Sequence, residues 1–93
     1  MPRKTFSEEI ENAFKGVQTL LEGMIKDRSV PRNIKRIAQR AIDELQKDGE
    51  TPGVISSSVL FLVGDLSLDP NIPFHSRSTI YRIVSILETI RDD

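Results

Sequence analysis

The sequence predicts an all-α protein, a four-helix antiparallel up-and-down bundle, and three observations support this fold class. The pattern D-x-x-x-P occurs three times at 21-residue intervals, as DRSVP (27–31), DGETP (48–52) and DPNIP (69–73). Apolar residues between these segments recur with the same 21-residue step. The chain has 93 residues, of which 38% are hydrophobic and 29% charged. This size and composition are typical of one small globular domain.

Each D-x-x-x-P segment is typical of a turn between two helices. The aspartate side chain can accept a hydrogen bond from the backbone two residues on, and proline fits the first turn of a helix. We expect Ser29, Thr51 and Asn71 to cap the helices that follow, and Thr5 with Glu8 to form a capping box before the first helix. Helices are therefore expected over about residues 6–26, 31–47, 52–68 and 73–91.

Apolar residues 21 positions apart form four columns. Within each expected helix the columns fall at i, i+3, i+4 and i+7, which is one face of an α-helix. The columns are Val17, Ala38, Val59 and Ile80; Leu20, Ala41, Leu62 and Ile83; Leu21, Ile42, Val63 and Val84; and Met24, Leu45, Leu66 and Leu87. One apolar stripe per helix favours a closed bundle. The same repeat also allows an alternative, two HEAT-like helical hairpins with a 42-residue period.

The composition limits the class of protein. Residues 1–93 are expected to form a single helical domain, with short flexible ends at about 1–5 and 92–93. The absence of cysteine excludes disulfides and thiolate zinc sites. No apolar run approaches the ~20 residues of a membrane span, and the first residues lack the apolar segment of a secretory signal. We therefore expect a cytoplasmic protein without a membrane partner.

Three segments of the chain carry a resemblance to known proteins. These are SVPRNIKRIAQRAIDEL, SLDPNIPFHSR and SILETIR, of which VPRNI and DPNIP are the most distinctive parts. They resemble a small archaeal family of uncharacterised proteins, and the resemblance covers Phe6 to Arg91. It implies a compact all-helical fold and brings with it no catalytic residue, cofactor or substrate.

Few residues in the sequence point to catalysis. His75 is the only histidine, and the upstream Asp65 and Asp69 could join it in a metal site, but their spacing matches no ligand motif. We expect His75 to bond a nearby backbone group instead. Serines 56–58 lack a G-x-S-x-G elbow and are more typical of close helix packing. We therefore expect no enzyme, no catalytic residue, no metal site and no cofactor.

Basic residues follow one face of the second expected helix. Arg32, Arg36 and Arg40 are spaced at i, i+4 and i+8, and Lys35 flanks them. Antiparallel helices would bring Arg77, in the first turn of the fourth helix, to the same end. These residues could form a phosphate or nucleic-acid surface beside the positive ends of two helices. The alternative is a solvated helix face, since no aromatic residues alternate with the basic ones.

The third expected helix, 52–68, contains Asp65 as its only charged residue. Val54, Phe61 and Leu68 lie seven residues apart and roughly opposite the core stripe, where the second and fourth helices have arginine in place of Phe61. A second apolar face on one helix of a bundle has to contact something. Loop or terminal residues of the same chain could cover it, or it could be an interface with a second copy or another protein.

These observations favour a small helical protein–protein interaction module that acts as a homo-oligomer or accessory subunit. A two-fold dimer is the commonest closed arrangement. The alternative is a nucleic-acid or ribosome-associated accessory protein that binds phosphate through its basic helix. No small-molecule substrate is evident in the sequence.

Overall fold

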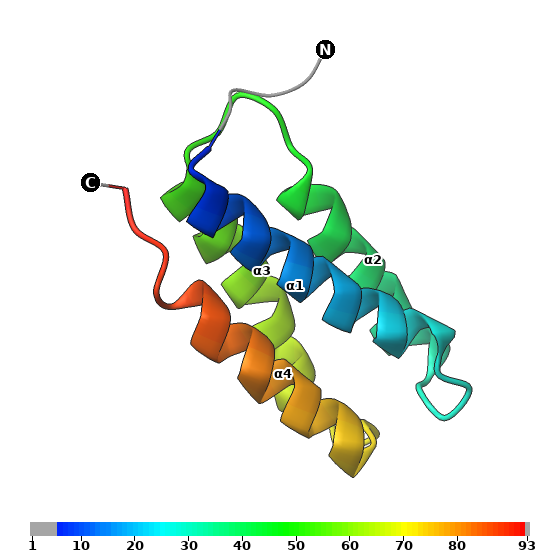
Figure 1. Ribbon diagram of the computed structural model, residues 1–93. Helices are drawn as coiled ribbons and strands as arrows, with labels where there is room; N and C mark the ends of the chain where they lie inside the picture. The colour runs from blue at the N-terminus through cyan, green and yellow to red at the C-terminus, as the bar shows by residue number, and fades with distance from the viewer. Residues whose placement is uncertain (1–5, 93) are drawn as a thin grey trace.

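The computed structural model describes residues 6–92, which form four α-helices and no strand. The helices are α1 (Glu8–Lys26), α2 (Arg32–Leu45), α3 (Pro52–Ser67) and α4 (Phe74–Leu87). Consecutive helices run in opposite directions, and α1 also packs against α4, so the four helices surround one core (Figure 1). The predicted all-α, four-helix fold is confirmed.

The antiparallel order separates the connections into two ends (Figure 1). The turns α1–α2 and α3–α4 lie together at one end, and the α2–α3 turn lies at the other, with the start of α1 and the end of α4. The molecule measures 36 × 25 × 18 Å. In the part of the chain that the structure describes, no helix is both long and apolar enough to span a membrane.

The four apolar columns form the core. Thirteen of the sixteen column residues are buried, and the other three, Leu20, Leu62 and Val84, are half-buried. Residues outside the columns complete the core: Phe14, Val30, Ile34, Ile55 and Ile72 are also buried. Burial of a Leu, Ile or Val side chain stabilises a fold by about 1.5–3 kcal/mol, so this shared stripe positions the four helices.

Side-chain caps begin two of the helices. The Ser7 hydroxyl accepts a hydrogen bond from the Ile10 backbone N–H and begins α1. Thr5, expected in this role, lies outside the described residues. The Thr51 hydroxyl accepts from the Val54 N–H and begins α3, as predicted.

The predicted caps of α2 and α4 are wrong. The N-cap positions belong to Pro31 and Pro73, which have no side-chain cap bond. The aspartates of the two turns behave as expected, because Asp27 accepts from the Ser29 N–H and Asp69 from the Asn71 N–H, both at 2.8 Å. These bonds place residues 29 and 71 inside the turns, two positions before the N-caps and too early to reach the first helical N–H groups.

The helices following these turns end earlier than predicted. The last helical residues are Leu45 in α2 and Leu87 in α4. Gly49, in the connection after α2, has a φ of 83°. This left-handed conformation suits glycine because it has no Cβ, so the sharp change of direction between α2 and α3 occurs where the sequence predicts it.

Candidate interaction surfaces

The exposed large apolar side chains all lie in the second half of the described chain. They are Val54, Phe61, Leu68, Phe74 and Tyr81, with exposed fractions of 44%, 73%, 80%, 82% and 58%. Val54 and Phe61 lie on α3, Leu68 directly follows it, and the other two lie on α4. No loop or tail segment within residues 6–92 covers Phe61 or Leu68. We call Val54, Phe61 and Leu68 the apolar face.

A shallow hollow of about 390 Å³ lies between α2 and α3 beside Phe61. Its lining residues are Arg40, Glu44, Ser57, Ser58, Phe61 and Leu62. Glu44 forms an ion pair with Lys47 at 3.6 Å. Neither Arg40 nor Asp65, which lies one turn beyond Phe61, forms an ion pair with any residue from 6 to 92. The apolar face thus combines a protruding aromatic ring, an adjacent hollow and two unpaired charges of opposite sign.

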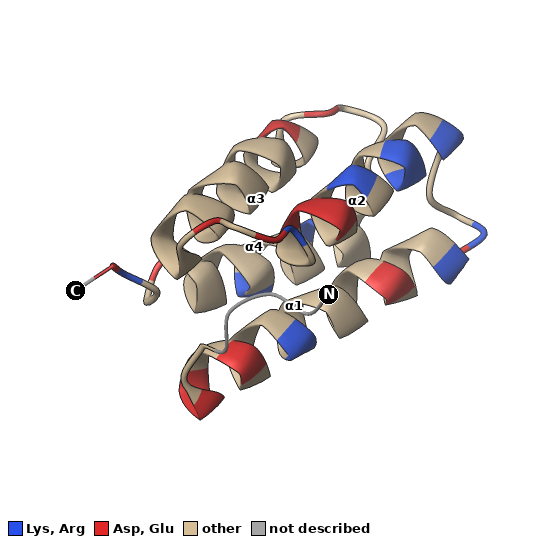
Figure 2. Ribbon diagram, turned by 90° about the horizontal axis from the view of Figure 1, so that it is seen from above, with Lys and Arg blue, Asp and Glu red and all other residues tan. Residues whose placement is uncertain are grey.

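The basic residues of α2 form the second candidate surface. We call Arg32, Lys35, Arg36 and Arg40 the basic ridge. The three arginines are exposed, Lys35 is half-buried, and none of the four forms an ion pair with another described residue. Figure 2 shows basic residues along α2 from its first turn, while the first turn of α1, at the opposite end, is acidic.

Arg77 is at the same end of the bundle as the start of α2, but its side chain contacts the α3–α4 turn. Its Nη2 donates a hydrogen bond to the Asp69 carbonyl oxygen at 3.3 Å. Its Nε is buried and has no partner in the part of the chain that the structure describes. Arg77 therefore lies at the end of the bundle that the sequence predicts, but its guanidinium is directed toward the α3–α4 turn.

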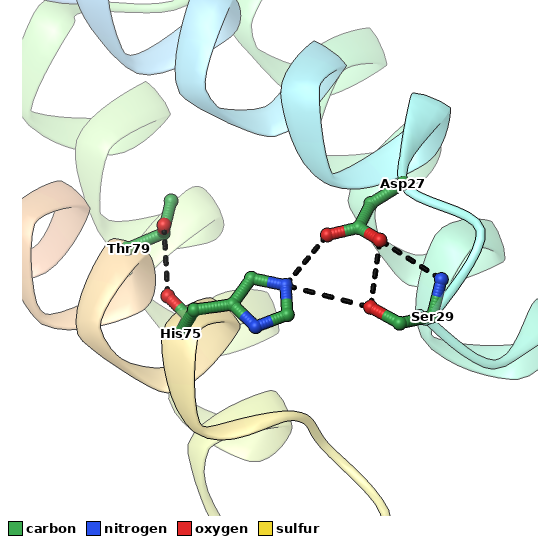
Figure 3. A network of polar contacts seen from close by, with 4 residues as sticks. All are labelled: Asp27, Ser29, His75 and Thr79. Atoms are coloured by element: carbon green, nitrogen blue, oxygen red, sulfur yellow. Dashed lines mark hydrogen bonds and ion pairs between the residues drawn. The ribbon is translucent and has the colours of Figure 1, made fainter.

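His75 lies in a small polar network between two elements far apart in the sequence (Figure 3). Its Nε2 is 2.6 Å from Asp27 Oδ2 and 3.4 Å from Ser29 Oγ. The Ser29 hydroxyl and backbone N–H both donate to Asp27 Oδ1, at 2.6 and 2.8 Å. Hydrogen bonds from the Ser29 hydroxyl, from His75 and from the Ser29 N–H lower the pKa of Asp27 to about 2.

The network has the residue types of a Ser-His-Asp triad but not its geometry. A triad uses one ring nitrogen for the serine and the other for the carboxylate, whereas here both oxygens face the same Nε2 (Figure 3). The Ser29 proton is directed to Asp27 and not to the ring. The histidine cannot act as a base toward Ser29 in this arrangement, so the contact joins the α1–α2 turn to α4.

A second contact repeats this arrangement in the other turn. Asn33 Nδ2 donates to Asp69 Oδ2 at 3.4 Å. Asp69 follows Asp27, and His75 follows Asn33, by the same 42 residues. The amide of Asn33 has no acid–base function, which supports a structural role for His75 as well. The prediction that His75 bonds a nearby backbone group is wrong, because its ring contacts the side chain of Asp27. The 42-residue spacing of the two pairs was a signal in the sequence for this partner.

The remaining sequence candidates are separated by the fold. His75 contacts Asp27 and not Asp65 or Asp69, and residues 6–92 contain no group of three or more His, Asp or Glu side chains able to hold a metal ion. Ser56 is buried and donates to the Leu87 carbonyl oxygen at 2.7 Å. Ser57 and Ser58 line the hollow beside Phe61.

Comparison with known proteins identifies relatives over nearly the whole chain. Residues 1–90 match the uncharacterised protein family UPF0147. A UPF0147 protein of Saccharolobus solfataricus is 44% identical over 82 residues, which is 88% of this chain and 92% of the relative. A UPF0147 protein of Methanocaldococcus jannaschii is 41% identical over 81 residues, 87% of either chain.

Two crystal structures have the same fold. One, of a protein of unknown function designated MMP1188, is 36% identical, with a TM-score of 0.85 over 96% of this chain and 99% of that one. The other, a member of UPF0147 from Thermoplasma acidophilum, is 31% identical, with a TM-score of 0.82 over 89% and 98% of the two chains. The predicted resemblance to an archaeal family is confirmed, and the chain belongs to the UPF0147 family.

Proposed function

We propose that the protein is a small helical interaction module, acting as a homo-oligomer or an accessory subunit, and that the apolar face of α3 is its binding surface. The observation that carries this proposal is the exposure of Phe61 on α3 and of Leu68 directly after it, 73% and 80%, in a closed bundle. Contact between water and apolar surface is unfavourable by about 25 cal/mol per Å². A partner that covers these side chains would therefore be stabilised by their burial.

The distribution of charge supports the same surface. The helices α1 and α2 contain six charged Asp, Glu, Lys or Arg residues each, whereas α3 contains one and α4 two. Outer helix faces in contact with water normally carry charge. Depletion of charge around exposed aromatic residues is characteristic of the central part of a protein–protein interface.

The test compares the complex that the protein forms in an archaeal cell extract with that of a face variant. Tagged wild-type protein should elute from a sizing column well ahead of a 10.5 kDa monomer. Phe61→Lys should elute as a monomer, because a lysine ammonium would be desolvated in the interface. Gln39→Lys adds the same charge on α2 beside the α1–α2 groove and should elute like the wild type. Equal elution of all three proteins would refute the proposed surface.

A second candidate function rests on the basic ridge. Its four cations have no acidic partner within residues 6–92, and the start of α2 beside them has no side-chain cap. Such a surface is suited to the phosphates of a nucleic acid, including ribosomal RNA.

Binding of a single-stranded RNA and of a DNA duplex, measured by fluorescence anisotropy at several salt concentrations, tests this candidate. The affinity should fall steeply with salt, by a slope of about 0.9 per phosphate contact on duplex DNA. Combined replacement of Arg32, Arg36 and Arg40 by alanine should reduce both affinity and slope for every sequence, while Lys15→Ala on α1 should not. Affinity that is insensitive to salt and to the triple substitution would exclude the ridge.

A further inference from the structure

We infer that the partner of the apolar face is a second copy of this chain, with the two α3 helices antiparallel about a two-fold axis near Phe61. This inference rests on the proposed function, because it names the partner of the same surface. Three features of the face support it: the spacing of its apolar residues, its shape and the position of its charges.

The apolar residues are spaced symmetrically about Phe61. Val54 precedes it by seven residues and Leu68 follows it by seven. In two antiparallel helices related by a two-fold axis at position 61, residue 61 + k of one copy lies opposite residue 61 − k of the other. Val54 of each copy is then opposite Leu68 of the other, and the two Phe61 side chains lie on either side of the axis at the centre. The heptad spacing keeps all three side chains on one seam.

The shape of the face is complementary to itself. Phe61 protrudes beside the hollow of about 390 Å³ between α2 and α3. A two-fold interface uses the same patch on both copies, so each ring can enter the hollow of the other copy. Small residues lie next to the ring: Ser57 and Ser58 line the hollow, and a Cβ added at Gly64 would contact nothing within 4 Å in the single chain. They allow the close helix approach of about 8 Å that small contact residues permit.

The charges also favour the antiparallel arrangement. Asp65 is four residues after Phe61, so it lies opposite Ser57 of the second copy. In that copy Ser57 and Arg40 line the same hollow. Asp65 and Arg40 form no ion pair within residues 6–92 of one chain, so two symmetric Asp65–Arg40 contacts become available in the dimer. A parallel arrangement would place Asp65 opposite Asp65, which is repulsive.

Sedimentation equilibrium of the purified full-length chain tests the stoichiometry. At high micromolar concentration the wild type should have about twice its 10.5 kDa chain mass. Phe61→Lys should be a monomer with the same helical circular dichroism, because the side chain is 73% exposed in the single chain. Gln39→Lys should remain a dimer.

Engineered cysteines test the orientation, because the chain has no cysteine of its own. Val54→Cys and Leu68→Cys should form a disulfide with each other when the two variants are mixed and oxidised. Neither should form one with itself, because identical positions would be 14 residues apart along the helices, or about 21 Å, beyond the ~7 Å Cα limit for a disulfide. Self-linking of Val54→Cys would overturn the antiparallel arrangement.

A charge exchange tests the Asp65–Arg40 contact. Arg40→Glu and Asp65→Arg should each weaken the dimer by about threefold to tenfold, and the double variant should recover most of the loss. Arg32→Glu, two turns earlier on α2, should leave the dissociation constant unchanged. Absence of recovery in the double variant would overturn this pairing.

Failure of the inference is distinguishable from failure of the proposed function. A wild type that stays monomeric when pure, while Phe61→Lys still changes the complex in extract, overturns the second copy as partner and retains the surface for another protein. A wild type that is dimeric together with an equally dimeric Phe61→Lys also overturns the inference, because the subunits then meet elsewhere. Equal elution of wild type and Phe61→Lys in extract overturns the proposed function as well.

Discussion

The two helical hairpins of the molecule, α1–α2 and α3–α4, are related by a shift of 42 residues and are alike inside but different outside. Equivalent core positions such as Leu45 and Leu87 are almost completely buried in both. The outer surfaces differ, since α1 and α2 contain twelve of the fifteen Asp, Glu, Lys and Arg residues in the helices. The fold constrains the inner face of each helix, whereas the outer faces can differ in charge without disturbing the core.

The turns of the two hairpins have similar geometry. Val30 and Ile72 are equivalent and both buried, with 4% and 6% of their surface exposed. Each turn also contacts the start of the other hairpin's second helix, through Asp27–His75 and Asp69–Asn33. These reciprocal contacts join each turn to the opposite hairpin at one end of the bundle.

The interior is not fully symmetric. The second hairpin has two buried serines, Ser56 and Ser76, at positions where the first has Phe14 and Ile34. Ser56 donates a hydrogen bond to a carbonyl oxygen, whereas the Ser76 hydroxyl has no partner in the part of the chain that the structure describes. The second hairpin therefore has less apolar side-chain volume in its core and more apolar side chains exposed on its surface.

Equivalent core truncations should give the largest effect. Leu45→Ala and Leu87→Ala should each lower the free energy of unfolding by about 2–5 kcal/mol, measured by urea denaturation. The half-buried pair, Leu20→Ala and Leu62→Ala, should cost less because these sites can relax into solvent. A cost below about 0.5 kcal/mol for only one of the buried leucines would break the equivalence of the hairpins.

The two buried serines should respond in opposite directions. Ser56→Ala should lower the free energy of unfolding by about 0.5–1.5 kcal/mol, because a buried hydrogen bond is lost. Ser76→Ala should raise it by about 1 kcal/mol, because an unpaired buried hydroxyl is removed. Thermal and urea denaturation of both variants provide the measurement. Destabilisation by Ser76→Ala comparable to that of Ser56→Ala would show that its hydroxyl does have a partner.

Replacement of one helical glycine in each hairpin by alanine should give a smaller change, a gain in stability. Gly23→Ala and Gly64→Ala should each raise the free energy of unfolding by about 0.5–1 kcal/mol, since an added Cβ meets nothing within 4 Å at either site. The measurement belongs at low protein concentration, where association does not contribute. Gly49→Ala is the contrasting control and should destabilise, because its φ of 83° is unfavourable for other residues.

The pH dependence of the Asp27 contact should give the smallest effect, and it should distinguish the α1–α2 turn from the α3–α4 turn. The pKa of Asp27 in the folded chain is about 2, below its ordinary value of 3.8. Its carboxylate therefore stabilises the fold fully above about pH 4, and this contribution is lost as the pH falls toward 2. The difference in urea midpoint between the wild type and Asp27→Asn should shrink over that interval. A difference that stays constant from pH 4 to pH 2 would contradict this account.

Replacement of His75 by its counterpart provides the matching control for the turn. His75→Asn should keep most of the wild-type urea midpoint at neutral pH, because Asn33 makes the equivalent contact in the other turn. His75→Ala should lose more, since no side chain of α4 then contacts Asp27 and only the Ser29 donors within the same turn remain. Equal loss in both variants would mean that the imidazole makes a contribution the amide cannot replace.

The sequence predicts the number, order and inner faces of the helices because these depend on local features. The 21-residue repeat of turns and apolar columns identifies all four helices, and thirteen of the sixteen column residues are buried. The prediction fails at the caps of α2 and α4. Residues 29 and 71 have suitable side chains for capping, but the aspartates two positions earlier hold their backbones within the turns.

Contacts between distant parts of the chain depended on the tertiary structure. Asp27 and His75 are 48 residues apart, and their 2.6 Å contact exists because antiparallel packing brings the α1–α2 turn to the start of α4. Likewise, the sequence shows that α3 has a second apolar face, but cover by a loop and exposure to a partner agree equally with that pattern. Helix periodicity is a property of one segment, whereas exposure depends on every segment that could pack against it, so only the assembled bundle shows Phe61 uncovered by the described chain.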